Sequence, residues 1–161
     1  MSTSSPSVQR VVQALSERGV EPSIEAFPEG TRTAVDAAAA VGCDVAQICK
    51  SLVFRRASGG ALLVIASGVN RVDEAKVSAL AGEPVAMAGA AFVREATGFA
   101  IGGVPPVGHA RPLETIVDRD LLALGEVWAA AGTPRDVFAI APDALVAVTG
   151  GRVADVATRG S

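Results

Sequence analysis

The sequence predicts an α+β fold built around a mixed β-sheet, and three observations lead to this prediction. Apolar residues recur at helical spacing in several segments that begin at a capping residue and end at a glycine. Runs rich in Val, Ile, Leu and Phe lie between these segments. Two of the runs, 51–56 and 61–67, are joined only by residues 57–60 (ASGG), which indicates a hairpin. Because hairpins occur beside helical crossovers, a mixed sheet is expected rather than a doubly wound parallel one.

Capping residues mark where the helices begin. Ser5 followed by Pro6 is typical of a helix N-cap with proline at the first helical position. Thr33-x-x-Asp36 resembles a capping box ahead of an alanine run, and Asp44 repeats the device for a shorter helix. Helices are therefore expected between residues 5 and 19, 33 and 42, and 44 and 47, and over 73–81, 90–96 and 142–148.

Apolar runs bounded by turn residues mark the strands. An extended segment is expected over 21–27, and strands over 51–56, 61–67, 85–87, 113–117, 125–130, 137–140 and 153–156. The apolar density of the run 61–67 predicts a central strand. Because no linker or repeat interrupts this pattern, one domain is expected over 1–161, with an ordered core of about 5–157 and loose ends at 1–4 and 158–161.

Length and composition bound the function classes. At 161 residues the chain suits one domain, and an apolar fraction of 50% excludes a disordered chain. A net charge of −3 argues against broad binding of nucleic acids such as DNA, which needs a basic face, and leaves room for a small local contact. No apolar run approaches the roughly 18 residues of a membrane helix, and the N-terminus lacks a signal-peptide pattern. A soluble, cytoplasmic protein without a membrane partner is expected.

Cysteine usage argues against disulfides and metal sites. Cys43 and Cys49 are the only two cysteines, too few and too close in sequence for a disulfide framework. No further cysteine or group of histidines completes a zinc site. We therefore expect reduced thiols, with no metal and no cofactor. The oligomeric state is left open by the sequence.

The composition singles out one lysine. Of the 14 basic residues twelve are arginine, and only Lys50 and Lys76 are lysine. Because the chain uses arginine for most of its cations, a lysine indicates a position that needs a compact, rotatable ammonium group instead of a planar guanidinium. Lys50 falls where the short helix meets the first strand of the hairpin. Lys76 is interpreted as a surface cation on a helix that Asp73 caps.

The segment 96–118 (ATGFAIGGVPPVGHARPLETIVD) has unusual backbone chemistry. Gly102 and Gly103 permit positive φ or close backbone approach, and the two prolines that follow fix φ and lack an N–H group. The result is a rigid, open backbone that can present amides to a ligand. His109, the only histidine, follows directly. The alternative is a tight corner or bulge, and the dinucleotide fingerprint G-x-G-x-x-G is absent.

Four stretches of the chain, taken in order, resemble the YbaK/prolyl-tRNA synthetase-associated editing domain family: 33–54 (TAVDAAAAVGCDVAQICKSLVF), 96–109 (ATGFAIGGVPPVGH), 115–122 (TIVDRDLL) and 131–145 (AGTPRDVFAIAPDAL). The strongest elements are Lys-Ser-Leu at 50–52 and Thr-Gly-x-x-x-Gly-Gly-x-x-Pro-x-Gly at 97–108. The resemblance covers nearly the whole chain. It implies a mixed, partly barrel-like sheet flanked by helices.

The resemblance also implies an activity. The family contains free-standing deacylases, hydrolases of ester bonds that remove a wrong amino acid from the 3′ end of a tRNA. The substrate implied is tRNA(Pro) carrying a small wrong amino acid such as Cys or Ala, and the partners implied are the acceptor end of that tRNA and prolyl-tRNA synthetase. Such editing is needed because a pocket separates amino acids differing by one methylene only about 10- to 200-fold. The alternative is a non-catalytic module of the same fold that binds tRNA or the synthetase.

By position, Lys50 matches the functional lysine of the family, at the pocket mouth. Gly102 and Pro106 match its glycine-x-x-x-proline loop. Ester hydrolysis builds negative charge on the carbonyl oxygen, and free N–H groups of Gly102 and Gly103 are expected to stabilise that charge. Lys50 is expected to hold the terminal phosphate or ribose and so to align the ester, without acting as a base.

Further substrate contacts are expected at Pro106, Gly108 and His109 in the loop, and at Ala131 in the pocket wall. The sequence leaves the roles of two residues open, one a candidate base and the other a candidate nucleophile. His109 is a candidate general base or a surface residue, and Cys49 is a candidate thiol nucleophile, on an unrelated small ester, or an apolar residue buried at a helix end.

Trp128, the only tryptophan, is a candidate for stacking on a nucleic-acid base. Trp128, flanked by Val and Ala, is interpreted as core rather than as a platform for base stacking.

Overall fold

The computed structural model describes residues 5–28, 31 and 33–159. The predicted loose ends at 1–4 and 160–161 lie outside these residues. Thr158 and Arg159, which share the C-terminal prediction, are held in place: the Thr158 N–H donates to the Arg71 carbonyl at 2.7 Å, and Arg159 pairs with Asp120 at 2.9 Å and Asp155 at 2.8 Å. These bonds hold Thr158 and Arg159 against residues from three other parts of the chain.

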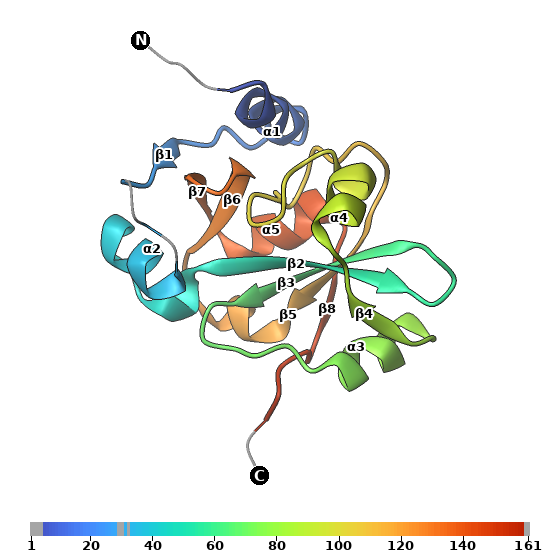
Figure 1. The fold of residues 1–161 in the computed structure, drawn as a ribbon. Coiled ribbons are helices and arrows are strands. Elements are labelled where there is room, and N and C mark those ends of the chain that lie inside the picture. The colour runs from blue at the N-terminus through green and yellow to red at the C-terminus, as the bar shows by residue number, and fades with distance from the viewer. Residues whose placement is uncertain (1–4, 29–30, 32, 160–161) are drawn as a thin grey trace.

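A five-stranded mixed sheet forms the centre of the molecule, in the order β4-β2-β3-β5-β8 (Figure 1). Its strands are β2 (Cys49–Arg56), β3 (Ala61–Ser67), β4 (Val85–Met87), β5 (Glu114–Asp118) and β8 (Arg152–Ala154). The β2–β3 and β2–β4 pairs are antiparallel, whereas β3–β5 and β5–β8 are parallel. The predictions of a mixed sheet, of the hairpin and of a central position for 61–67 are therefore confirmed.

A second sheet contains three antiparallel strands in the order β1-β7-β6: β1 (Ile24–Ala26), β7 (Asp136–Ile140) and β6 (Val127–Thr133). An isolated parallel bridge between Ile48 and Trp128 brings its edge to the start of β2. The two sheets thus curve toward each other as the partly barrel-like prediction requires. β6 runs three residues further than predicted, because an irregularity between Ala130 and Thr133 lets the strand continue through Gly132, whose φ is +102°.

In the described part of the chain, five α-helices and two short 3₁₀ helices surround the sheets: α1 (Pro6–Glu17), α2 (Ala34–Val41), α3 (Glu74–Ala81), α4 (Ala90–Thr97), α5 (Pro142–Thr149), and 3₁₀ helices at Val45–Gln47 and Arg119–Ala123. The predicted caps are present. The Ser5 hydroxyl accepts from the Val8 N–H at 3.2 Å, and the Thr33 hydroxyl accepts from the Asp36 N–H at 3.0 Å. Within the described ranges, none of these helices has the length and apolarity needed to cross a membrane.

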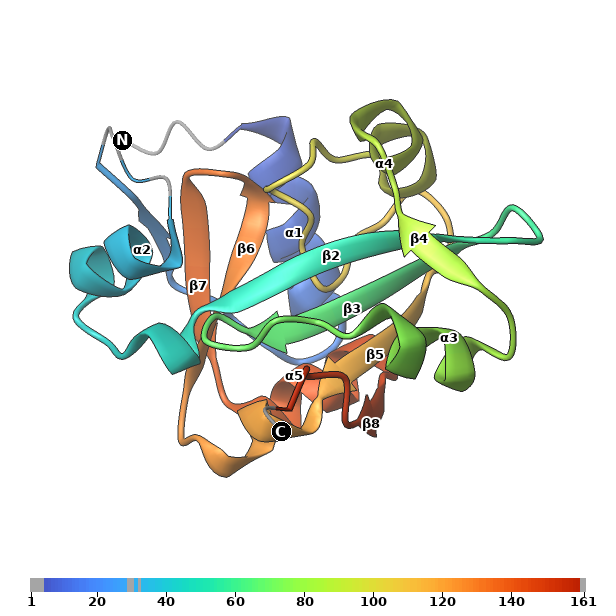
Figure 2. The ribbon, with the colours of Figure 1, turned by 60° about the horizontal axis from the view of Figure 1, so that its bottom comes forward.

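The main core lies between the two sheets, where α1 and α5 close it (Figure 2). It includes Leu15 of α1, Ile65 of β3 and Phe138 of β7, all fully buried. A second core lies between the larger sheet and α3, and a third joins α2 to the smaller sheet. The glycine-proline segment 98–113 runs between α4 and α1 (Figure 1), so that one of its sides can face the sheets and the other α1.

Candidate active site

A cavity of about 380 Å³ opens where the start of β2 approaches the smaller sheet. Its walls come from β2, from the segment 101–104, from β6 and β7, and from the first turn of α2. Trp128, Val137 and Phe27 make much of this wall apolar, and Met87 and Ile101, which also line it, are about half exposed, at 50% and 51%. A small apolar space with a few polar groups on its wall is typical of a small-ligand site.

Lys50 supplies the cation of this cavity. It is the second residue of β2, half-buried, and its Nζ donates to the Asn70 carbonyl. An ammonium group has three N–H donors, so two remain for a ligand. Burial lowers the pKa of Lys50 below its usual value of 10.5, and the negative charge of Asp118 partly offsets this effect. Lys50 is therefore a restrained and incompletely satisfied cation.

Asn70 connects Lys50 to a buried carboxylate. The Asn70 side-chain amide donates to Asp118 at 2.7 Å and to Asp120 at 2.8 Å. Asp118 is fully buried and also accepts from the Ser67 N–H at 3.1 Å and the Asp120 N–H at 2.9 Å. These hydrogen bonds offset the cost of burying the carboxylate. The network therefore fixes both the position of Asn70 and the charge that faces Lys50.

Gly102 lies on the opposite wall of the cavity. It is the third residue of a turn in which the Gly103 N–H donates to the Ala100 carbonyl at 3.0 Å, and its φ is +88°. A turn of this kind needs positive φ at the third position, which favours glycine. Gly102 is an exposed residue, and its N–H has no hydrogen-bond partner among the described residues. This amide can donate to a ligand.

Gly103 has a different reason to be glycine. A Cβ on it would lie 2.7 Å from the backbone of Thr133 and 2.9 Å from the nitrogen of Pro134. It is buried, and its N–H is already used by Ala100. Gly103 thus lets the segment 101–104 pack against the turn between β6 and β7. Its predicted part in charge stabilisation remains a prediction, and its N–H would have to leave the Ala100 carbonyl to take that part.

The remaining loop residues face another space. Pro106, Gly108 and His109 line a groove of about 910 Å³ between the loop and α1, and this groove shares no lining residue with the Lys50 cavity. The His109 Nε2–H donates to the Pro105 carbonyl at 2.6 Å, which leaves Nδ1 as an acceptor in the neutral ring. Burial lowers the pKa of His109. His109 is therefore neutral at pH 7 and apart from Lys50.

Cys49 lines the cavity, whereas Ala131 is buried in the core beside it. Cys49 begins β2 instead of ending a helix, lines the cavity, and has a pKa that burial, assisted by Asp118, raises to about 12. A thiol in that state is a poor nucleophile. Ala131 is fully buried in the main core, and its neighbour Ala130 lines the cavity. Trp128 is 8% exposed, as a core residue should be, although one side of it forms cavity wall.

Sequence reasoning did not identify Asn70 or Asp118 as part of the site. Asn70 follows β3 and Asp118 is the last residue of β5, and these two strands lie side by side, since they are parallel with Ile65 opposite Val117. The carboxyl ends of parallel neighbours meet at the same edge of a sheet, so polar residues after two such strands are a usable signal. That signal requires the strand order, which the sequence did not provide.

The arrangement suits the binding of an ester beside a cation. A carbonyl oxygen placed near the Gly102 N–H would receive a hydrogen bond that strengthens as charge develops on it, and the two free donors of Lys50 would contact a neighbouring hydroxyl or phosphate. In the described part of the chain no three His, Cys, Asp or Glu residues come together as metal ligands would.

Comparison with protein families gives a match. The family described as "Aminoacyl-tRNA editing domain" matches residues 28–148. This range contains Lys50, Asn70, Gly102 and Asp118, and so covers the cavity and its supporting network.

Similar proteins and structures agree with that match. A crystal structure described as that of a "putative trans-editing enzyme for prolyl tRNA synthetase" is 51% identical, with a TM-score of 0.92 over 98% of this chain and 100% of the other. The "Uncharacterized protein YwhH" of Bacillus subtilis (strain 168) is 30% identical over 78% of this chain and 80% of its own length. The "Putative Cys-tRNA(Pro)/Cys-tRNA(Cys) deacylase EbsC" of Enterococcus faecalis (strain ATCC 700802 / V583) is 24% identical over 83% and 82%.

Proposed function

This chain belongs to the aminoacyl-tRNA editing domain family, and from that premise we propose that it hydrolyses the ester of mischarged tRNA(Pro), acting in trans on a small wrong amino acid such as Cys or Ala. The observation that carries the proposal is the meeting of Lys50 and Gly102 on one small apolar cavity. These two residues lie in different motifs, and the fold brings them to the same space.

The proposed reaction uses the backbone for the charge and Lys50 for position. Attack on the ester carbonyl turns its oxygen into an oxyanion, and the Gly102 N–H, held by its turn, donates to that oxygen without further rearrangement. Lys50 binds the ribose or phosphate beside the ester, which aligns the carbonyl with a water molecule or with the adjacent ribose hydroxyl. Water is the nucleophile that releases the amino acid: it forms the new bond to the carbonyl carbon and gives a proton to solvent. The oxyanion then collapses, the bond to the ribose oxygen breaks, and that oxygen takes a proton from solvent, so that the free amino acid and the tRNA leave.

The size and character of the cavity support a small, uncharged side chain. Trp128, Ala130 and Val137 line it and offer no charged partner. The names of two similar proteins support tRNA(Pro) as the carrier, since one is described as a trans-editing enzyme for prolyl tRNA synthetase and the other as a deacylase of Cys-tRNA(Pro). Prolyl-tRNA synthetase is accordingly the partner we propose.

A panel of charged tRNAs tests this function. The purified protein is incubated with tRNA(Pro) carrying Ala, Cys, Ser, Thr or Pro, and with the same amino acids on their own tRNAs, and the loss of the ester is followed. Rapid release of Ala or Cys from tRNA(Pro), with Pro spared, is the expected result. Tight binding of these tRNAs with no release above the uncatalysed rate would instead indicate the non-catalytic binding module.

A further inference from the structure

We infer that the nucleotide carrying the ester lies in a second groove, next to the cavity and lined by Val69, Asn70, Arg71, Glu74 and Met87. This inference rests on the proposed function and extends it, because it assigns a binding site for the 3′-terminal nucleotide. The groove has a volume of about 380 Å³, which falls in the range of roughly 300–1,000 Å³ typical of small-ligand sites.

The first argument is continuity. In an aminoacyl ester the amino acid is bonded directly to the ribose, so the nucleotide must occupy a space that opens into the amino-acid cavity. The second groove shares Lys50, Leu52 and Met87 with that cavity. The larger groove along α1 shares no lining residue with it. Lys50 therefore stands at the boundary of two connected spaces, where the ribose of the ester would lie.

The second argument is exposed apolar surface. Val69 is 62% exposed and Met87 is 50% exposed, and both are among the few large apolar side chains that the described part of the chain leaves open to solvent. They come from different elements, the loop after β3 and the end of β4, and line the same groove. Apolar side chains on two sides of a groove suit the face of a nucleobase, whose stacking is favourable and tolerant of sequence.

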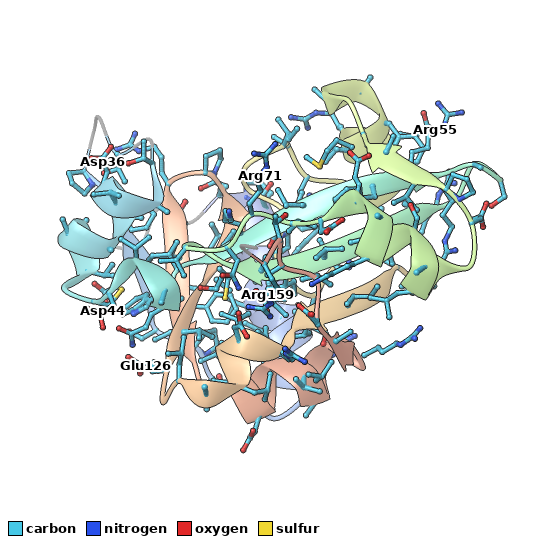
Figure 3. The ribbon with its side chains drawn as sticks, turned by 90° about the horizontal axis from the view of Figure 1, so that it is seen from below. Asp36, Asp44, Arg55, Arg71, Glu126 and Arg159 are labelled. Carbon is cyan, nitrogen blue, oxygen red and sulfur yellow. The ribbon has the colours of Figure 1, made fainter. Side chains whose placement is uncertain are left out.

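The third argument is charge. The Arg71 guanidinium has neither an ion pair nor a hydrogen bond in the described part of the chain, although the Arg71 carbonyl accepts from the Thr158 N–H. Figure 3 shows Arg71 on the same side of the molecule as Arg159 of the C-terminal segment. With Lys50, Arg71 provides two cations for one phosphate, and Glu74 provides an acceptor for a sugar hydroxyl. The groove thus has a partner for each part of a nucleotide.

Matched substitutions test the assignment. Arg71→Gln and Val69→Ser are compared with Arg152→Gln and Val153→Ser, which alter an exposed arginine and an exposed valine on β8, away from the groove. The KM for mischarged tRNA is expected to rise about tenfold in each groove variant, with kcat changed less than about threefold, because ground-state binding is lost. Both β8 variants should match the wild type. A wild-type KM in Arg71→Gln would overturn the assignment.

Direct binding separates this inference from the proposed function. Adenosine 5′-monophosphate is titrated into the wild-type protein and into Arg71→Gln, and amide chemical shifts are followed. Shifts centred on 69–72 and about tenfold weaker binding in Arg71→Gln support the groove, even if no tRNA is deacylated and the proposed function fails. Shifts centred on α1 and His109 instead, in a protein that does deacylate tRNA, would overturn the groove and leave the function intact.

Discussion

The segment 98–113 has a small cavity on one side and a larger groove on the other, and the two differ in what they could do chemically. The cavity of about 380 Å³ is largely apolar, and its lining includes the restrained ammonium group of Lys50 and the unbonded backbone N–H of Gly102. The groove of about 910 Å³ is lined by three arginines, by Glu17 and by a histidine whose Nε2–H is already bonded. More polar groups lie in the groove, yet the preorganised donors lie in the cavity.

The difference teaches that a continuous motif need not form a continuous site. Ile101, Gly102 and Val104 face the cavity, whereas residues from Pro106 to Leu113 face α1. Pro105 and Pro106, both buried, lie where the two halves meet, and their fixed φ restrains the backbone there. Substitutions on the cavity side of the loop are therefore expected to lower the rate of deacylation, whereas substitutions on the α1 side should leave it unchanged.

The largest effect is expected at Lys50. Lys50→Ala should lower the single-turnover rate of deacylation about 10³-fold while the protein stays folded, because the ammonium group that aligns the ester is lost. Lys50→Arg should also be impaired, since a planar guanidinium does not fit the place of a compact ammonium. The control is Lys76→Ala, which removes the ion pair with Asp155 and should leave the rate unchanged. A folded Lys50→Ala variant with the wild-type rate would refute this prediction.

Two glycines with nearly the same φ provide the next test. Gly102 and Gly108 have φ of +88° and +87°, so alanine at either position should cost about 1 kcal/mol of the free energy of unfolding. Only Gly102→Ala should also lower the rate, by about 10²-fold, through displacement of a preorganised donor. Thermal unfolding and single-turnover kinetics of both variants check this. Equal rate losses in the two variants would show that the loop acts as a structural corner.

A smaller effect is expected at Cys49 and His109. Cys49→Ala and His109→Gln should each change the rate less than about threefold, because the thiol is not ionised and the imidazole lies in the other space. Cys49→Ala should cost about 1 kcal/mol of the free energy of unfolding through lost packing. Denaturant titration and kinetics measure the two quantities. A loss on the order of 10²-fold in either variant would restore the thiol or imidazole hypothesis.

The smallest effect is a pH dependence of the free energy of unfolding, caused by His109 in the larger groove along α1. Burial, together with the charge of Arg18, lowers the pKa of His109 below 6.5, against an opposing hydrogen bond to Pro105. The folded state therefore disfavours the protonated ring. The free energy of unfolding should be full above about pH 6.5 and should decrease as the pH falls from there through the lowered pKa. In His109→Gln this part of the decrease should be absent, and an unchanged pH profile would argue against the burial of a neutral ring.

The sequence predicted the fold well because its signals are local. Ser5, Thr33 and Asp73 cap the helices they were expected to cap, and the run 61–67 is the central strand. Those features depend on neighbours a few residues away. The extent of β6 was missed because a bulge continues the strand through a glycine that looked like a break.

The candidate site was harder to predict because it depends on distant contacts. The need for glycine at 103 comes from Thr133, and the restraint on Lys50 comes from Asn70 and, behind it, Asp118. Neither contact is visible before the strand order is known. The family motif pointed to Lys50 and to the whole loop, but it could not show which half of the loop shares a cavity with Lys50.

The most direct measurement locates the ligand. An analogue in which alanine is joined to the 3′ position of adenosine by an amide in place of the ester resists hydrolysis and can be titrated while amide chemical shifts are recorded. The account predicts the largest shifts at Lys50, Gly102 and Ala130, with Gly108 and His109 unaffected. Shifts concentrated at Gly108, His109 and α1, with Lys50 and Gly102 unchanged, would contradict it and would move the active site to the other side of the loop.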